Sequence, residues 1–158
     1  MNHSIQKGFS FGLSSGIITT LGLIVGLYSG TGSKMVVVGG ILTIAIADAF
    51  SDALGIHLSE EAEGVHSARE IWEATISTFV VKFFFSMIFV LPIIFLETLT
   101  AIFVSIGWGL LVLGLFSYYI AKKDKANPAK AIAEHLVIAI LVIIVTYYVG
   151  LWVPKVFK

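Results

Sequence analysis

Cysteine is absent from the 158-residue sequence, which excludes disulfides, thiolate metal sites and cysteine nucleophiles and leaves the redox compartment undetermined. Charge is scarce, because only 13% of the residues are Asp, Glu, Lys or Arg, whereas ordinary soluble domains have about 25%. The formal net charge is zero and no basic tract stands out. This charge balance argues against nucleic acid as a partner.

Apolar residues take the place of the missing charge. They make up 58% of the sequence, and the mean hydropathy is +0.99, as in an integral membrane protein. The first uncharged run, residues 8–33, is much longer than the apolar part of a signal peptide, which has roughly 7–15 residues. It is therefore interpreted as a membrane span, and the length allows a single domain.

Five segments approach the roughly 20 apolar residues that a spanning helix needs. We expect an all-α integral membrane protein with a single transmembrane domain over residues 1–158 and a short acidic loop at 57–72. The expected spans are residues 9–30, 34–57, 73–96, 98–121 and 131–153.

The basic residues indicate the orientation of these spans. Six lie on the side of the N-terminus, namely Lys7, Arg69, Lys122, Lys123, Lys125 and Lys130. Three lie on the other side, namely Lys34, Lys155 and Lys158. The positive-inside rule therefore predicts a cytoplasmic N-terminus and an external C-terminus. The host would be the plasma membrane of a prokaryote or a vacuole-like organelle membrane of a eukaryote, with lipid as a partner.

Asp48 and Asp52 lie one helical turn apart in the second span, at depths of roughly 15 and 9 Å if the helix surfaces near residue 58. A carboxylate at the bilayer centre costs roughly 2.5–3.5 kcal/mol on insertion scales. One explanation is hydrogen bonding between helices, which serine or asparagine would provide at lower cost. The other is a site for divalent cations, with protons as coupled partners.

Lys82 lies roughly 14 Å deep in the third span, at the depth of Asp48. We expect the two to pair, because pairing lowers the cost of burying each charge. Lys82 is then either a structural counterion or a competitor of the transported cation.

The acidic loop predicts a cytoplasmic metal-collecting group made of His57, Glu60, Glu61 and Glu63. A solvated, charged loop is the plainer alternative. Farther along, Ser67 and Glu70 have the spacing of a capping box at the start of the third span.

Glycines recur at four-residue spacing in the first span, where small residues let helices approach closely in lipid. They favour packing within one bundle, a dimer face, or both. The glycines concerned are Gly12, Gly16, Gly22 and Gly26.

The chain resembles the vacuolar iron transporter family over nearly its whole length, in the ordered stretches GFSFGLSSGIITTLGLIVGLYSG, ADAFSDALGIHLSEEAE, VLPIIF and NPAKAIAEHLVIAILVIIVTYYVG. The resemblance implies a five-helix homodimer that moves Fe²⁺ or Mn²⁺ out of the cytosol against protons, along a path between the first two helices. The family has an aspartate where this chain has Ser15, a methionine where it has Asp52, and a glutamate near Ile44. It is thus a short, divergent relative.

Three functions remain open. The leading one is a divalent-cation (Fe²⁺ or Mn²⁺) transporter, which is not an enzyme and binds metal as substrate with no permanent cofactor. The others are an intramembrane metal-dependent lipid enzyme and a non-transporting membrane assembly protein on the same fold.

The charge count makes the orientation testable. In Lys123→Cys and Lys158→Cys variants, a membrane-impermeant maleimide should label the two positions from opposite sides of the membrane, because one expected span, residues 131–153, lies between them. Labelling of both positions from one side would contradict the five-span topology.

Overall fold

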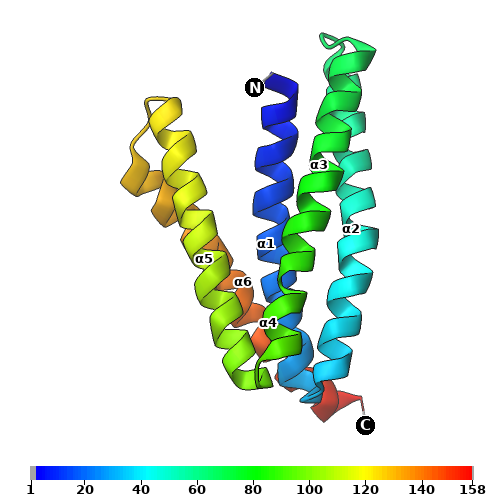
Figure 1. Cartoon of the computed structure of the whole chain (residues 1–158), viewed down its shortest axis with the longest axis vertical. Helices are drawn as coiled ribbons and strands as arrows, with labels where there is room; N and C mark the ends of the chain where they lie inside the picture. Colours follow the sequence, from blue (N-terminus) through cyan, green and yellow to red (C-terminus); the bar gives the residue numbers. More distant parts are fainter. Residues whose placement is uncertain (1–2, 158) are drawn as a thin grey trace. The chain divides into compact units, whose positions relative to one another are not determined.

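The computed structural model describes residues 3–157, and they form helices joined by short connections (Figure 1). The helices are α1 (His3–Thr31), α2 (Lys34–Glu63), α3 (Ala68–Ile88), α4 (Val90–Phe95), α5 (Thr98–Lys123) and α6 (Pro128–Val156). With α3 and α4 taken as one rod, Ala68–Phe95, five rods are long and apolar enough to cross a membrane. The expected all-α architecture with five spans is confirmed. Lys158 lies outside the described residues.

The third rod is interrupted at Phe89, three residues before Pro92. Proline has no amide N–H to bond the carbonyl of Ile88, and its ring crowds that carbonyl. The Phe89 amide bonds Ser86 O at 3.2 Å, a tighter turn than an α-helix makes. The proline therefore accounts for the division between α3 and α4.

The second helix is longer than expected. The sequence predicted a loop over residues 57–72, but α2 continues to Glu63. Residues 58–63 (LSEEAE) are mostly good helix formers, and the helix stops where Gly64 takes a φ of +66°, which favours glycine. The capping box at the start of α3 is present, with Ser67 and Glu70 bonding each other's backbone amides.

The chain divides into two compact units. The first comprises residues 3–20 and 41–90, which are the start of α1, most of α2, and α3. Its third helix has a polar interior face and an apolar outer face. The buried residues of α3 are Ala74, Thr75, Thr78, Lys82 and Ser86. The exposed ones include Trp72, Ile76, Val80 and Phe84. This inversion suits a helix surrounded by lipid.

In this unit α1 approaches α3 through glycines. A Cβ atom at Gly12 would lie 2.7 Å from Thr78 O, and one at Gly16 would lie 3.1 Å from Lys82 O. Both distances are shorter than ordinary van der Waals contact, so only glycine fits this backbone separation without movement.

The second unit comprises residues 21–40 and 91–157. There the later glycines of α1 contact α6, because a Cβ at Gly22 would lie 2.8 Å from Val142 Cγ1 and one at Gly26 would lie 3.4 Å from Thr146 Cβ. Lys34 Nζ donates hydrogen bonds to the carbonyls of Ile94 and Leu96, at 3.0 and 3.1 Å. It thereby satisfies carbonyls at the end of α4.

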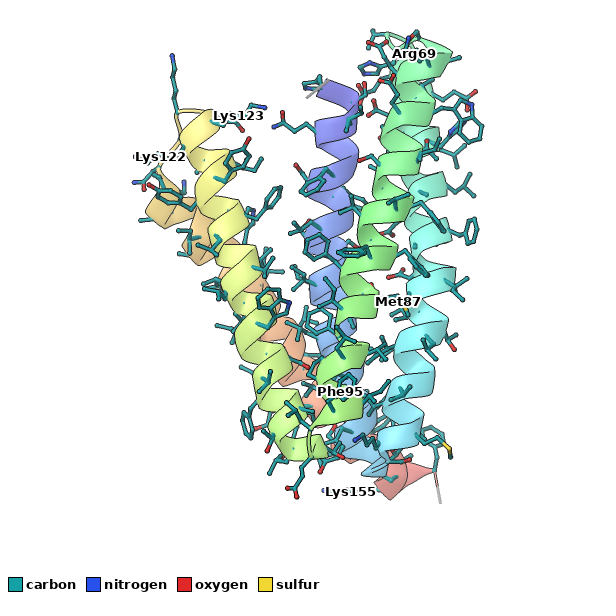
Figure 2. All side chains as sticks on the ribbon, in the orientation of Figure 1. Arg69, Met87, Phe95, Lys122, Lys123 and Lys155 are labelled. Atoms are coloured by element: carbon teal, nitrogen blue, oxygen red, sulfur yellow. The ribbon has the colours of Figure 1, made fainter. Side chains whose placement is uncertain are left out.

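Polar side chains mark the helix ends. Figure 2 shows Lys122 and Lys123 at the end of α5 and Arg69 in the first turn of α3. Asn127 caps α6 by accepting hydrogen bonds from the Ala129 and Lys130 amides. Basic residues near a helix C-terminus also complement its dipole.

The close approach of α1 to α3 predicts that adding one methyl group at Gly12 lowers the stability of the fold. Gly12→Ala should lower the free energy of unfolding by about 1–3 kcal/mol, because Thr78 and its helix must move away. Gly107→Ala in α5 is the matched control, since a Cβ there meets nothing within 4 Å. It should be neutral or stabilising by up to about 1 kcal/mol. Thermal unfolding in detergent measures both, and equal shifts would contradict the packing argument.

Candidate ion-binding site

Side chains from three helices of the first unit meet at Lys82 Nζ. It lies 2.5 Å from Asp48 Oδ2, donates a hydrogen bond to Asp52 Oδ2, and donates another to Ser15 Oγ at 2.9 Å. Ser15 Oγ in turn donates to Asp52 Oδ2 at 2.6 Å. The ammonium group is thus surrounded by three oxygen atoms, one from α1 and two from α2.

Local helix geometry explains this arrangement. Asp48 and Asp52 are four residues apart, so they share one face of α2. Lys82 reaches them from the buried face of α3, and its side chain lies against α1, with Cγ 3.4 Å from the position of a Cβ at Gly16. Glycine at position 16 leaves space for this aliphatic chain beside Ser15.

The charges at this site do not cancel. Two carboxylates face one ammonium, and Ser15 is neutral, so one formal negative charge remains. The Lys82 side chain is 1% exposed, whereas those of Asp48 and Asp52 are 28% and 20% exposed. Asp48 Oδ2 is buried, and its contact with Lys82 Nζ is an ion pair. The aspartates therefore retain the capacity and the access to bind a further cation.

A second cluster lies at the end of α2. Lys7 forms ion pairs with Glu60 and, at 3.0 Å, with Glu63. His66 Nε2 lies 3.1 Å from Glu63 Oε2 and 3.5 Å from Glu60 Oε2. One ligand atom from each of Glu60, Glu63 and His66 lies within 4.8 Å of the others, a spacing that suits a metal ion. The Glu60 side chain is completely buried.

The other residues expected to collect metal lie apart from this cluster. Glu61 is exposed and is not one of the grouped ligands. His57 Nδ1 is 3.0 Å from Thr75 Oγ1, and its ring packs against Trp72 with centroids 4.9 Å apart. His66, which lies in the same charged loop three residues after Glu63, completes the group of ligands.

Polar groups continue along the interior face of α3 in the first unit. Thr75 contacts His57, Thr78 follows one turn later, and Lys82 follows another turn later. Beyond it, Thr20 Oγ1 donates to Ser86 Oγ at 3.1 Å. These side chains give α3 a polar buried face from Thr75 to Ser86.

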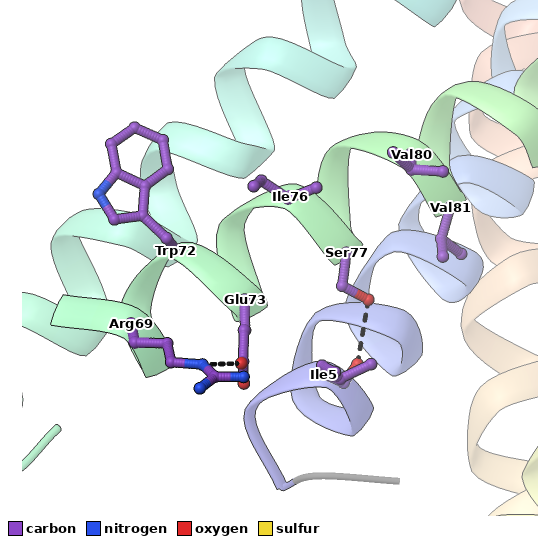
Figure 3. Close-up of a pocket in the computed structure, with 8 residues that line it drawn as sticks. All are labelled: Ile5, Arg69, Trp72, Glu73, Ile76, Ser77, Val80 and Val81. Carbon is purple, nitrogen blue, oxygen red and sulfur yellow. Dashed lines mark hydrogen bonds and ion pairs between the residues drawn. The ribbon is translucent and has the colours of Figure 1, made fainter. Parts of the chain in front are cut away.

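An apolar groove on this unit offers no comparable set of ligands. It runs beside α3, with Ile76, Val80 and Val81 along its length (Figure 3). Its charged residues bind each other, since Arg69 Nε donates to Glu73 Oε1 at 2.8 Å. Trp72 is half exposed at the same end, which is typical of a side chain at a membrane surface.

Comparison with protein families identifies a relationship. A family model described as the VIT family matches residues 52–151, which is more than half of the chain. The match includes Asp52 and Lys82 and begins after Ser15 and Asp48. A search of curated proteins found no match.

The ion-paired site predicts a non-additive response to mutation. Lys82→Met should destabilise the fold by roughly 3 kcal/mol, because it leaves buried carboxylates without their cation. Adding Asp48→Asn should recover part of that loss, since one of the unbalanced charges is removed.

Thermal unfolding of the two single variants and the double variant completes the cycle. Lys130→Met is the matched control, because Lys130 lies 3.8 Å from Glu134 in an exposed pair, which is worth about 0.5 kcal/mol. Simple additivity of the Lys82 and Asp48 changes would show that the two side chains do not interact energetically.

Proposed function

Since the chain belongs to the VIT family, a family of iron and manganese transporters, we propose that it carries divalent metal ions, Fe²⁺ or Mn²⁺, across a membrane. The single observation that supports this proposal is the convergence of Asp48 and Asp52 on one interior position with only one balancing ammonium. A membrane protein retains such a charge imbalance at a cost, and a transported cation explains it.

The chemistry of the ligands indicates which of the two metals is the better substrate. Ser15, Asp48 and Asp52 offer only oxygen atoms, and such sites suit Mn²⁺ and Mg²⁺ better than soft ions. Among the two metals, this favours Mn²⁺ over Fe²⁺. The family resemblance implies a methionine at the position of Asp52. A carboxylate there is a harder ligand than a thioether, and it therefore fits a site for Mn²⁺.

Export from the cytosol is the direction that the charges support. Glu60 and Glu63, which also contact His66, bind Lys7 near the N-terminus, the end that the positive-inside rule predicts to be cytosolic. Metal collected there would move along the polar interior face of α3 to the aspartates. Protons returning to the vacated carboxylates would complete an antiport cycle.

A homodimer is part of this proposal, but the interface differs from the one expected. Gly12, Gly16, Gly22 and Gly26 contact α3 and α6 of their own chain. An exposed row of small residues at four-residue spacing lies instead on α2, beside the partly exposed aspartates: Thr43, Ala47, Ser51 and Gly55. Pairing two copies through this row would shield both aspartates from lipid.

Flux into proteoliposomes tests the function. The wild type should transport Mn²⁺. Asp52→Asn should reduce transport by about tenfold or more, because loss of a metal ligand should cost at least as much as loss of a ligand's hydrogen-bond partner, which costs about 10–100-fold. Glu61→Ala, in an exposed position outside both clusters, is the control and should retain most of the flux. Transport should also weaken as pH falls, because protons compete for the carboxylates.

Two outcomes would contradict the proposal. Unchanged Mn²⁺ flux in a folded Asp48→Asn/Asp52→Asn variant would make the aspartates structural. Absence of flux of either metal in the wild type would favour a non-transporting membrane protein on this fold.

A further inference from the structure

The position of the Lys82 ammonium is where a bound cation would be expected. Ser15 Oγ, Asp48 Oδ2 and Asp52 Oδ2 all lie within 2.9 Å of Lys82 Nζ. Oxygen atoms from two other helices thus surround a positive charge that the chain itself supplies. An incoming ion and Lys82 cannot both occupy this position, so binding requires the ammonium to move.

The ammonium is a strong competitor because it is held in place. The Lys82 side chain is 1% exposed and lies along α1 at Gly16. A group attached to the protein competes at a high effective concentration that dilution does not lower. A free ion must therefore gain more energy from the carboxylates than the ammonium loses.

Ion charge decides whether that condition is met. Coulomb attraction scales with the product of the charges. Before the cost of removing each ion's own water is counted, a monovalent ion at equal distance gains about what the ammonium loses, whereas a divalent ion gains about twice as much. Na⁺ and K⁺ then have no advantage over Lys82, whereas Mn²⁺ and Fe²⁺ do.

We propose that Lys82 is a specificity-determining residue that excludes monovalent cations by occupying the Ser15, Asp48 and Asp52 oxygens until a divalent ion displaces it. This inference rests on the proposed function and adds the means by which the site selects its substrate. A purely structural counterion would predict no change in ion selectivity when Lys82 is replaced.

Binding of Mn²⁺ to the purified full chain in nanodiscs tests the proposal, with free Mn²⁺ measured by electron paramagnetic resonance. Ionic strength is held constant while NaCl replaces N-methylglucamine chloride, so that only direct competition by Na⁺ changes the affinity. The proteins compared are the wild type, Lys82→Met, Lys82→Met/Asp48→Asn and Lys130→Met.

The wild type and Lys130→Met should bind Mn²⁺ equally in both salts. Lys82→Met should bind Mn²⁺ about tenfold more tightly without Na⁺, as expected if Lys82 fills the site about nine-tenths of the time. Its Mn²⁺ affinity should fall severalfold when Na⁺ is added. The double variant keeps the net charge of the wild-type site, so sensitivity to Na⁺ there shows that occupancy by the ammonium, rather than net charge, excludes the ion.

The double variant also keeps the test valid if Lys82→Met does not fold, because it removes one of the unbalanced carboxylates. It lacks Asp48 as a ligand and should bind Mn²⁺ more weakly, so the quantity compared is the ratio of its affinities with and without Na⁺. Mn²⁺ binding that is insensitive to Na⁺ in both Lys82 variants would overturn the selectivity role and leave the transport proposal standing. Equal sensitivity to Na⁺ in the wild type and the Lys82 variants would also overturn the selectivity role and leave the transport proposal standing. Loss of Mn²⁺ binding in all four proteins would overturn both proposals.

Discussion

The ion pairs of Lys82 with Asp48 and Asp52 are the interaction on which the first unit depends. A lysine at this depth in a membrane helix needs partners, and so do two carboxylates. Bringing them together requires α3 to turn its polar face inward and α1 to approach within the space that Gly12 and Gly16 leave. The polar interior and the lipid-compatible exterior follow from this one requirement.

A lysine that forms ion pairs with two carboxylates occurs twice in the first unit. At the end of α2, Lys7 binds Glu60 and Glu63, as Lys82 binds the two aspartates. In each cluster a lysine from a neighbouring helix lies among carboxylates that could bind a metal. In the proposed transport cycle, each lysine would have to move aside for an incoming cation.

Much of the fold was predictable because long apolar runs permit few alternatives in a membrane. The five spans follow from such runs, and the start of α3 follows from the spacing of Ser67 and Glu70. The end of α2 was harder to predict, since residues 58–63 are mostly polar and only Gly64 marks the stop. Helix propensity outside the bilayer, rather than hydropathy, determines that boundary.

The site was predictable only in part. Counting residues from the membrane surface matched Lys82 with Asp48, but such a count assigns depth and not direction, so the contacts with Asp52 and Ser15 were missed. Periodicity likewise revealed the glycines of α1 without indicating which helix each one contacts. These features depend on tertiary packing, which a single sequence does not record.

Anomalous diffraction from crystals grown with Mn²⁺ tests the central claim most directly. The account predicts a manganese peak bounded by Asp48 and Asp52, with Lys82 Nζ moved away from both carboxylates. A manganese peak elsewhere, with Lys82 still bound to Asp48 and Asp52, would contradict it.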